Sequence, residues 1–516
     1  MFAGCGGEKT ESTAAPSKEA GTEATTQATT AKAEPQYVEY WPVNQKGVTW
    51  EKDGPVAKWL VEKCGVGYWS PLVIWDGANG YYTKLQTRIA TGDLPDIFKP
   101  VKGIETSLIK EGLIWELSEY LPKYAPNIWK QIPESVWNTL RFNDPTGKNG
   151  IYYIPGVTPY NTNGTFIRKD WLDKLGLAVP TNQAEYVEVL KAFRDRDPNG
   201  NGQKDELPTT GREFGKWMDH LFFMYDVAVI GGGNPAFDIY DGDITFSAVT
   251  PNMKEALTFI RYLYKEKLLD NNTFLNKAND LWAAVGADKV GSWFHLPYGL
   301  DGMALINLVK VAPNADVVVL PPIAAEGYSG QITRTQSGDP AVCFGKNDEK
   351  QLINALTMLD WTMDEKNTEE IIFGVEGLHY KVENGKKVSV NIDENTTEKK
   401  PSFLYTTFES QLFVMKTRYE SMTGTDKSNM EQGLRAMNSS QGNLSRVIAQ
   451  DGMPNSIYDD YPDIMANKLY QEYMAKIVIG EWPIEKFDEF VEKWNSTGGA
   501  EVTKRVREWY AKVQAK

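Results

Sequence analysis

The residues with the most definite chemistry form a short acidic loop that starts at Asp197. It reads Asp-Pro-Asn-Gly-Asn-Gly-Gln-Lys-Asp-Glu. Calcium takes six to eight hard oxygen ligands, and oxygens at every second residue of a tightly turning chain can converge on one ion. The backbone carbonyl of Gln203 and a set of side chains are the expected ligands: Asp197, Asn199, Asn201, Asp205 and Glu206.

This loop departs from the EF-hand pattern at its last position. Position 12 is Pro208, so the bidentate glutamate expected there is absent and Glu206 has to close the coordination shell. A helix before the loop, in which Asn182 and Glu185 form a capping pair, supports the hypothesis. The alternative is an Asn/Gly/Asp turn that binds no metal. We predict a structural Ca²⁺ ion, because nothing in the loop indicates catalysis.

Recognisable catalytic patterns are absent from the sequence. Its three histidines, His220, His295 and His379, are too few and too scattered to indicate a zinc site or a catalytic triad. A glycoside hydrolase would need two carboxylates facing each other across a cleft, and none of the 69 acidic residues lies in a recognisable pair. The formal charge of −14 argues against nucleic acid as a partner. We therefore expect a protein that is not an enzyme.

The size and composition of the chain indicate a globular protein with more than one core. With 516 residues, 41% of them hydrophobic, two large α/β lobes are expected. The 16 Trp and 25 Tyr suit a protein that grips amphipathic molecules, although large cores also use aromatic residues. Cys64 and Cys343 are far apart in sequence and are expected to be buried thiols.

The N-terminal segment has the features of an anchor and a tether. Phe2-Ala3-Gly4-Cys5 resembles the end of the cleavage site in bacterial lipoprotein signal peptides, without the apolar stretch that precedes such a site. In those signals the cysteine carries acyl chains, so Cys5 is the expected point of lipidation and membrane attachment. Residues 6–36 contain no Val, Ile, Leu, Met or aromatic residue, which predicts a disordered tether. The folded body should begin near Tyr37.

Strands and helices alternate along the start of this body. We predict strands at 38–43, 71–75 and 96–98, with helices at 55–62 and around Tyr82, Leu85 and Ile89, the second ending at Gly92. This order implies a parallel sheet with helices on both faces. Ligands of such sheets bind beyond the carboxyl ends of the strands.

The alternation continues in the second half of the chain. Strands are predicted at 290–292 and 317–320, flanking a helix at 303–309. The part after about Tyr461 is helical, with apolar spacing at Phe487, Phe490, Val491 and Trp494.

Four short motifs together resemble the extracellular solute-binding proteins of ATP-binding-cassette importers. They are the segments 91–97 (Thr-Gly-Asp-Leu-Pro-Asp-Ile), 167–177 (Ile-Arg-Lys-Asp-Trp-Leu-Asp-Lys-Leu-Gly-Leu), the calcium loop, and 374–380 (Gly-Val-Glu-Gly-Leu-His-Tyr). The long subclass with such a calcium loop is similar to receptors for alginate and related oligosaccharides. The resemblance covers residues 37–516.

The resemblance implies a type II, periplasmic-binding-protein-like clamp whose two α/β lobes close on the ligand. The chain would cross between the lobes three times, near 156–160, 333–339 and 400–407. Lobe one would hold residues 37–157 and 338–402, and lobe two residues 158–337 and 403–516, including the calcium loop.

Candidate ligand contacts follow from position within that family. Residues 289–293 match the strand that ends in an aromatic residue of the cleft, so Trp293 is the first candidate, although an isolated Trp is more often a core residue. Glu376 and His379 are interpreted as turn and packing residues. The remaining candidates follow the second strand or lie beside a crossing: Trp75, Asp76, Tyr160, Asn161, Arg334 and Asp339.

The sequence therefore predicts a substrate-binding subunit that captures an oligosaccharide outside the cell. It would be a lipid-anchored monomer on the outer face of the bacterial membrane and would deliver its ligand to the permease subunits of the importer. The alternatives are a surface adhesin or a peptide-binding lipoprotein on the same plan, and a secreted glycoside hydrolase.

Overall fold

The structure is a computed structural model of the chain. It describes residues 35–42, 48–74, 79–100, 103–157, 163–295, 303–335, 337–390, 398 and 445–514. The folded body begins at Gln36, close to the predicted Tyr37. Cys5 and the predicted tether as far as residue 34 lie outside the described residues.

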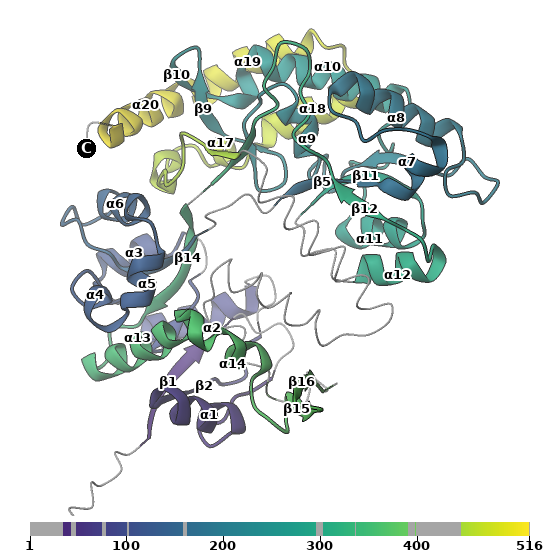
Figure 1. The fold of residues 1–516 in the computed structure, drawn as a ribbon. Coiled ribbons are helices and arrows are strands. Elements are labelled where there is room, and N and C mark those ends of the chain that lie inside the picture. Colours follow the sequence, from purple (N-terminus) through teal and green to yellow (C-terminus); the bar gives the residue numbers. More distant parts are fainter. Residues whose placement is uncertain are drawn as a thin grey trace, which may run out of the picture. The chain divides into compact units, whose positions relative to one another are not determined.

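The first sheet has the strand order β2-β1-β3-β14-β4 (Figure 1). β1 is parallel to β2 and β3, whereas β14 is antiparallel to both β3 and β4. The parallel arrangement predicted for the first three strands is therefore confirmed, and β14 and β4, which lie outside that stretch of sequence, add antiparallel pairs to the sheet. The strands are β1 (Gln36–Trp41), β2 (Val66–Trp69), β3 (Ile97–Phe98), β4 (Tyr153–Val157) and β14 (Ser337–Phe344).

Helices from two distant segments cover this sheet. Apolar residues of β1, β14 and α13 meet in one core, in which Val38, Phe344 and Leu356 have no exposed surface. The helices are α1 (Pro55–Cys64), α2 (Asn79–Thr91), α3 (Glu105–Lys110), α4 (Leu121–Tyr124), α5 (Pro126–Gln131), α6 (Glu134–Phe142), α13 (Glu349–Met363) and α14 (Thr368–Phe373). A hairpin of β15 (Tyr380–Glu383) and β16 (Lys386–Ser389) follows α14.

The second sheet has the order β12-β5-β11-β6. β11 is parallel to β6 and antiparallel to β5, and β12 is antiparallel to β5. Because β11 and β6 run in the same direction, their carboxyl ends lie at one edge and their amino ends at the other. The strands are β5 (Gly164–Arg168), β6 (Leu207–Thr210), β11 (Val290–His295) and β12 (Val317–Val319).

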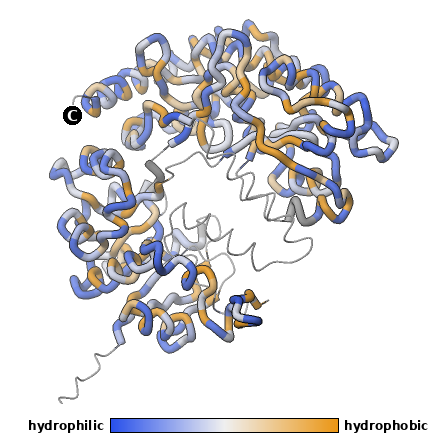
Figure 2. The backbone as a smooth tube through the Cα atoms, viewed as in Figure 1, coloured by the Kyte–Doolittle hydropathy of each residue, from blue (hydrophilic) through white to orange (hydrophobic). Residues whose placement is uncertain are grey.

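The second sheet packs mainly against helices that precede β11 or end the chain. Their hydrophobic and hydrophilic residues alternate along the tube in Figure 2, as expected for helices that bury one face. The helices are α7 (Lys169–Leu175), α8 (Gln183–Asp195), α9 (Asp219–Phe223), α10 (Pro251–Lys265), α11 (Ala278–Gly286), α12 (Met303–Val311), α17 (Pro462–Met465), α18 (Lys468–Ile479), α19 (Lys486–Trp494) and α20 (Ala500–Gln514). Short two-stranded pairs complete this part: β7 (Val229–Ile230) with β8 (Asn234–Pro235), β9 (Phe237–Tyr240) with β10 (Asp243–Phe246), and β13 (Ile332–Arg334) with β17 (Ser445–Val447).

The predictions for two elements near the N-terminus differ from the structure. The second strand is not 71–75 but Val66–Trp69, because Gly65 ends α1 in the left-handed conformation and the chain enters the strand directly. The buried face of α2 contains Tyr81 rather than the half-buried Tyr82. The stop of α2 at Gly92 is confirmed, with φ 69°.

The two largest hydrophobic cores among the described residues are each built from two separate stretches of sequence. Residues between 38 and 154 join residues 342–363 in the first core. Residues between 167 and 332 join residues 457–509 in the main core around the second sheet. The assignment of these stretches to two lobes stays a prediction. The exact boundaries stay predictions, and the crossing expected at 400–407 lies outside the described residues.

Candidate functional site

The carboxyl ends of β6 and β11 bring two nitrogen-rich side chains together. In the register of these strands Trp293 is the partner of Thr210, so the chain after β6 passes close to the end of β11. Arg212 Nη2 lies 3.5 Å from His295 Nε2. Ligands of open α/β sheets bind at this edge, which makes the two residues the starting point of a candidate site.

Two tryptophans flank His295. The ring of Trp217 is stacked on the imidazole, with 4.6 Å between centroids and 22° between planes. The ring of Trp282, from α11, meets the same imidazole edge to face at 4.6 Å and 78°. Both indoles are half-buried, so each keeps exposed surface. Flat aromatic surface beside polar groups is what a sugar ring requires, because it presents an apolar face and a rim of hydroxyls.

A backbone of unusual conformation holds Arg212 and Trp217 in place. Reciprocal hydrogen bonds join the backbones of Arg212 and Lys216, at 2.9 and 2.7 Å. Four of the five residues 213–217, here named the left-handed loop, have positive φ, including Glu213 (51°), Phe214 (64°) and Trp217 (61°). Each non-glycine residue in this conformation costs about 1–2 kcal/mol. Such strain is typical of functional sites.

A glycine provides the space for the Trp217 indole. A Cβ atom at Gly232 would lie 3.0 Å from the indole ring, and the φ of this glycine is 83°. The backbone N–H of Trp217 donates to the carbonyl of Gly232 at 3.1 Å. The position of the indole is therefore fixed from both its backbone and its ring.

The buried titratable groups beneath this edge have structural roles. Burial raises the pKa of Asp219 to about 7 and lowers the pKa of His220 to about 3. His220 is therefore neutral at physiological pH, and its Nε2 lies 3.2 Å from the hydroxyl of Tyr186. That hydroxyl also donates to Ser292 Oγ at 2.9 Å, which ties α8 to β11.

The predicted calcium loop lies at the opposite ends of the same strands. The side-chain amide of Asn199 donates to the carbonyl of Asp288 at 3.1 Å, and Lys289 Nζ lies 2.8 Å from Asp205 Oδ2. Asp288 and Lys289 directly precede β11, and the loop itself leads into β6. The carboxylate of Asp197 accepts hydrogen bonds from backbone N–H groups inside the loop.

Glu206 is the residue of this loop that the protein alone does not satisfy. Its side chain is 8% exposed, and neither carboxylate oxygen accepts a well-aligned hydrogen bond. Burial raises the pKa of Glu206, and the negative charges of Asp197 and Asp205 raise it further. A buried carboxylate without a partner is costly, and a cation among these three acids would offset that cost.

The loop is nevertheless not arranged as a finished metal site. Among the described residues, no group of three or more His, Cys, Asp or Glu side chains is gathered closely enough to hold an ion. Asn201 instead donates to Asp205 Oδ1 at 2.9 Å. The residue types suit calcium, and small side-chain rotations would have to bring their oxygens together.

Four of the predicted ligand contacts lie outside the described residues: Trp75, Asp76, Tyr160 and Asn161. Trp75 and Asp76 also do not directly follow the second strand, which ends at Trp69. Asp339 lies within β14, and its side chain is outside the described part. Arg334 ends β13 and is half-buried, and burial lowers its pKa.

Trp293 occupies a core position. Its strand does not end at Ser292, as predicted, but continues to His295. Trp293 is fully buried and lies in one cluster with Leu281 and Leu308, and its ring is stacked on Phe166 at 5.8 Å. This placement favours a packing role, and the role of Trp293 as a ligand contact stays a prediction.

Sequence reasoning missed Arg212, Trp217 and Trp282. The available signal was their position, since Arg212 follows β6 by two residues and Trp282 lies on the helix that leads into β11. The β6 strand is short and contains Pro208, which hides it from pattern analysis. The left-handed conformations that orient the side chains of the left-handed loop cannot be recognised from its sequence, Glu-Phe-Gly-Lys-Trp.

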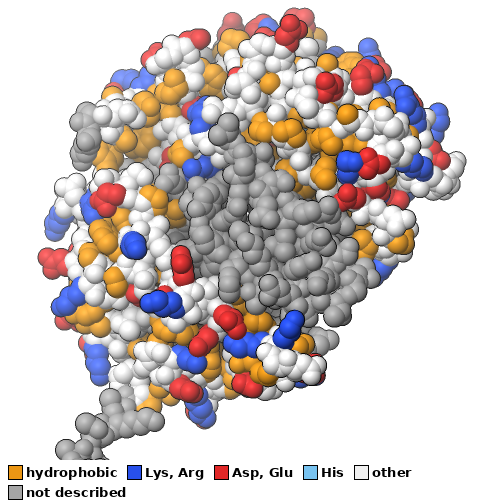
Figure 3. Space-filling view, viewed as in Figure 1, with side chains coloured by type: hydrophobic (Ala, Val, Ile, Leu, Met, Phe, Trp, Pro, Cys, Tyr) orange, Lys and Arg blue, Asp and Glu red, His pale blue; other side chains and the backbone are white. Residues whose placement is uncertain are grey.

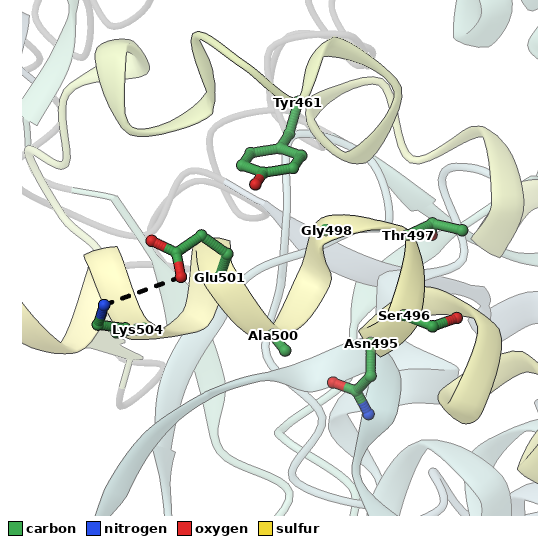
Figure 4. Close-up of a pocket in the computed structure, with 8 residues that line it drawn as sticks. All are labelled: Tyr461, Asn495, Ser496, Thr497, Gly498, Ala500, Glu501 and Lys504. Atoms are coloured by element: carbon green, nitrogen blue, oxygen red, sulfur yellow. Dashed lines mark ion pairs between the residues drawn. The ribbon is translucent and has the colours of Figure 1, made fainter.

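Other surface features carry less information. A wide, shallow depression of about 630 Å³ lies at the kink between α19 and α20, where Gly498 faces Tyr461 (Figure 4). Its polar lining includes Glu501 and Lys504, 3.9 Å apart. On the face drawn in Figure 3, acidic and basic side chains are interspersed over the described residues. No helix in the described part is long and apolar enough to cross a bilayer.

Two mixed β-sheets are each packed against helices, and the core around each sheet combines two separate stretches of sequence. This is the fold of a two-lobed substrate-binding protein. Solved structures share it: the S. pneumoniae ABC-transporter substrate-binding protein FusA with kestose matches with a TM-score of 0.63 and 19% identity, over 93% of this chain and 100% of FusA. The alginate-binding protein AlgQ2 matches with a TM-score of 0.62 and 19% identity, over 93% and 99% of the two chains. The chain belongs to the family of bacterial extracellular solute-binding proteins, whose sequence model matches residues 73–369.

Relatives by sequence include proteins named for sugar transport. Lipoprotein LipO of Bacillus subtilis (strain 168) is 25% identical over 449 residues, 85% of this chain and 86% of LipO. The fructooligosaccharide ABC transporter substrate-binding protein FusA of Streptococcus pneumoniae serotype 4 is 31% identical over 229 residues, 42% of each chain. The polygalacturonan/rhamnogalacturonan-binding protein YtcQ of Bacillus subtilis (strain 168) is 24% identical over 456 residues, 84% of this chain and 83% of YtcQ.

The burial of Trp293 leads to a first testable prediction. Trp293→Ala should lower the free energy of unfolding of the ligand-free protein by about 3–5 kcal/mol, because the cavity left by a buried indole is not refilled. Urea unfolding measures this loss. Trp282→Ala, which removes a half-buried ring, is the matched control and should cost clearly less. Unchanged stability of the Trp293 variant, together with lost ligand affinity, would show that the ring faces the ligand after all.

Proposed function

We propose that the protein captures an extracellular oligosaccharide and delivers it unchanged to an ABC importer. The observation that carries the proposal is the pair of half-buried indoles, Trp217 and Trp282, on either side of His295 at the carboxyl edge of β6 and β11. Aromatic faces cover the apolar faces of pyranose rings, while Arg212 and His295 can bind their hydroxyls. Membership of the solute-binding family and the names of the relatives support the same reading.

The expected partners follow from that role. Substrate-binding proteins of this class work with the membrane permease subunits of their importer, and we expect the present chain to do so as a monomer. Binding without catalysis is part of the proposal, and it is supported by relatives that are named as binding proteins.

A glycan-binding screen tests the proposal. The full chain should be stabilised by at least one oligosaccharide in a panel of glycans and peptides, by about 2.7 kcal/mol at 100 times the dissociation constant. Trp217→Ala and Trp282→Ala should each weaken that binding about tenfold to a hundredfold, because each ring contributes on the order of 1–2.5 kcal/mol of apolar contact. Tyr510→Ala, on α20, is the control. If only peptides stabilise the protein, it is a peptide receptor and not an oligosaccharide receptor. Release of free sugar from the ligand would indicate an enzyme.

We also propose that the loop at residues 197–206 binds a structural calcium ion. The proposal is supported by the oxygen-rich residue set and by the buried, unpartnered carboxylate of Glu206. Asp197, Asn199, Asn201, Asp205 and Glu206 would supply side-chain oxygens and Gln203 its carbonyl. The neighbours named for calcium, AlgQ2 without calcium ion and a FusA EF-hand mutant, are consistent with a metal site in this fold.

Removal of calcium should lower the melting temperature of the protein, and Asp197→Ala should abolish the response to calcium. Glu206→Gln should abolish it too, while raising the melting temperature of the metal-free protein, because it removes an uncompensated buried charge. The unfolded chain loses the Glu206 proton at a pKa of about 4.3 and the folded, metal-free protein at a higher pKa. Metal-free stability should therefore fall as the pH rises through that window, and calcium should remove the fall.

The control for this experiment is Asp488→Asn, an exposed carboxylate on α19. It should leave the calcium response intact. Elemental analysis that finds no metal after incubation with calcium would contradict the proposal.

Anchoring to the membrane is proposed through Cys5. Its support is the lipobox-like Ala3-Gly4-Cys5 and the lipoprotein name of the relative LipO. When the protein is expressed with a complete lipoprotein signal peptide, it should sediment with membranes, and Cys5→Ser should release it into the medium. Cys64→Ser is the control and should remain attached. Membrane association that survives the Cys5 substitution would rule out the anchor.

A further inference from the structure

Arg212 combines burial with incomplete pairing. Its side chain is 8% exposed, and among the described residues its Nε–H has no hydrogen-bond acceptor. The 3.5 Å separation between Nη2 and His295 Nε2 is too long for a strong hydrogen bond. Burial lowers the pKa of Arg212 even though Glu213 lies beside it. Since a guanidinium remains charged in proteins, a buried one requires acceptors that this site only partly supplies.

The acceptor that Arg212 does have is exposed and strained. Glu213 Oε1 accepts from Arg212 Nη1, and its side chain is 42% exposed. Glu213 also has a left-handed backbone, with φ 51°, and its N–H donates to Asn276 at 2.8 Å. Its backbone is therefore fixed, whereas its carboxylate can rotate into solvent at little cost. Another carboxylate could therefore replace Glu213, whereas the positive charge of Arg212 is permanent.

The surroundings of the guanidinium suit a second carboxylate better than a hydroxyl. The guanidinium carbon lies 4.6 Å from the centre of the Trp217 ring, so the indole covers one face of the guanidinium. In-plane N–H pairs match the two oxygens of a carboxylate and form short, charge-assisted bonds. The carboxylate of Glu213 already accepts from one of these N–H groups.

We propose that Arg212 binds a carboxylate of the ligand in exchange for Glu213, and that the ligand is accordingly an oligosaccharide containing uronic acid. This inference rests on the proposed function, because it specifies the class of sugar that the edge site takes. The sugar ring that carries the carboxylate would lie next to the guanidinium. While no ligand is bound, the carboxylate of Glu213 stays paired with Arg212. Its negative charge repels any acidic ligand that does not take its place on the guanidinium.

The test uses matched pairs of sugars. Trimers of galacturonic, mannuronic and glucuronic acid are compared with the same trimers after reduction of their carboxyl groups, by isothermal titration of the full chain. The best uronate should bind at least tenfold more tightly than its reduced counterpart, and added salt should narrow the difference. Arg212→Gln should abolish this preference. Glu213→Gln should strengthen uronate binding, because the competing carboxylate is gone.

The control is Arg194→Gln at the end of α8 that leads into the loop of residues 197–206, where Arg194 pairs with the adjacent Asp195 in the same sequence arrangement. It should leave the preference for uronates unchanged. Urea unfolding verifies that the Arg212 variant folds, and the exposed Glu213 variant supplies an independent reading if it does not. Equal or tighter binding of the reduced trimers, or no binding of any uronate, overturns the inference while leaving oligosaccharide capture standing if neutral glycans bind. Failure of all glycans overturns the proposed function as well.

Discussion

The parallel pairing of β6 with β11 is the constraint on which both candidate sites depend. Two neighbouring strands that run in the same direction gather their amino ends at one edge of a sheet and their carboxyl ends at the other. The loop of residues 197–206 and the Asp288–Lys289 corner meet at the first edge. Arg212 and His295 meet at the second. The register of a few residue pairs therefore fixes the composition of both sites.

Each edge contains one buried ionic group that the chain compensates incompletely, and the two groups have opposite charge. Glu206 at the amino ends has no hydrogen-bond donor, and Arg212 at the carboxyl ends has an unpaired N–H. Both arrangements reduce the stability of the ligand-free protein. The backbone strain of the left-handed loop lies in the same part of the molecule, so the second sheet carries both incompletely compensated groups and the strained loop.

The sequence predicted elements where local chemistry dominates. The N-terminus of α8 is an example, since the side chain of Asn182 accepts from the N–H of Glu185 at 2.9 Å, as the capping pattern required. The helix α19 buries Phe487, Phe490 and Trp494, as their spacing indicated. These features depend on residues three or four positions apart, so a single pass along the chain can find them.

Features that depend on distant residues were missed or misplaced. β14 follows all strands of the second sheet in the sequence and yet pairs in the first sheet. Its antiparallel direction cannot be predicted from local sequence patterns. Trp293 and Trp282 look alike in sequence, and only the packing of α11 and α12 decides that the first is buried and the second half-exposed. The resemblance to a family predicted the fold correctly, but it did not point to Arg212, Trp217 or Trp282 at the carboxyl edge, and the calcium loop stays a prediction.

The place of β14 has a consequence for how the chain acquires its structure. β14 lies between β3 and β4, so these two strands have no hydrogen-bonded contact until β14 is inserted. A ribosome that has released residues 36–157 has therefore delivered a sheet with a missing strand. The first sheet cannot be completed until the segment that forms the second sheet has also emerged, followed by β14. Until then its unpaired backbone groups remain exposed. The strand order therefore imposes this interval whenever the chain begins to fold before its synthesis is complete.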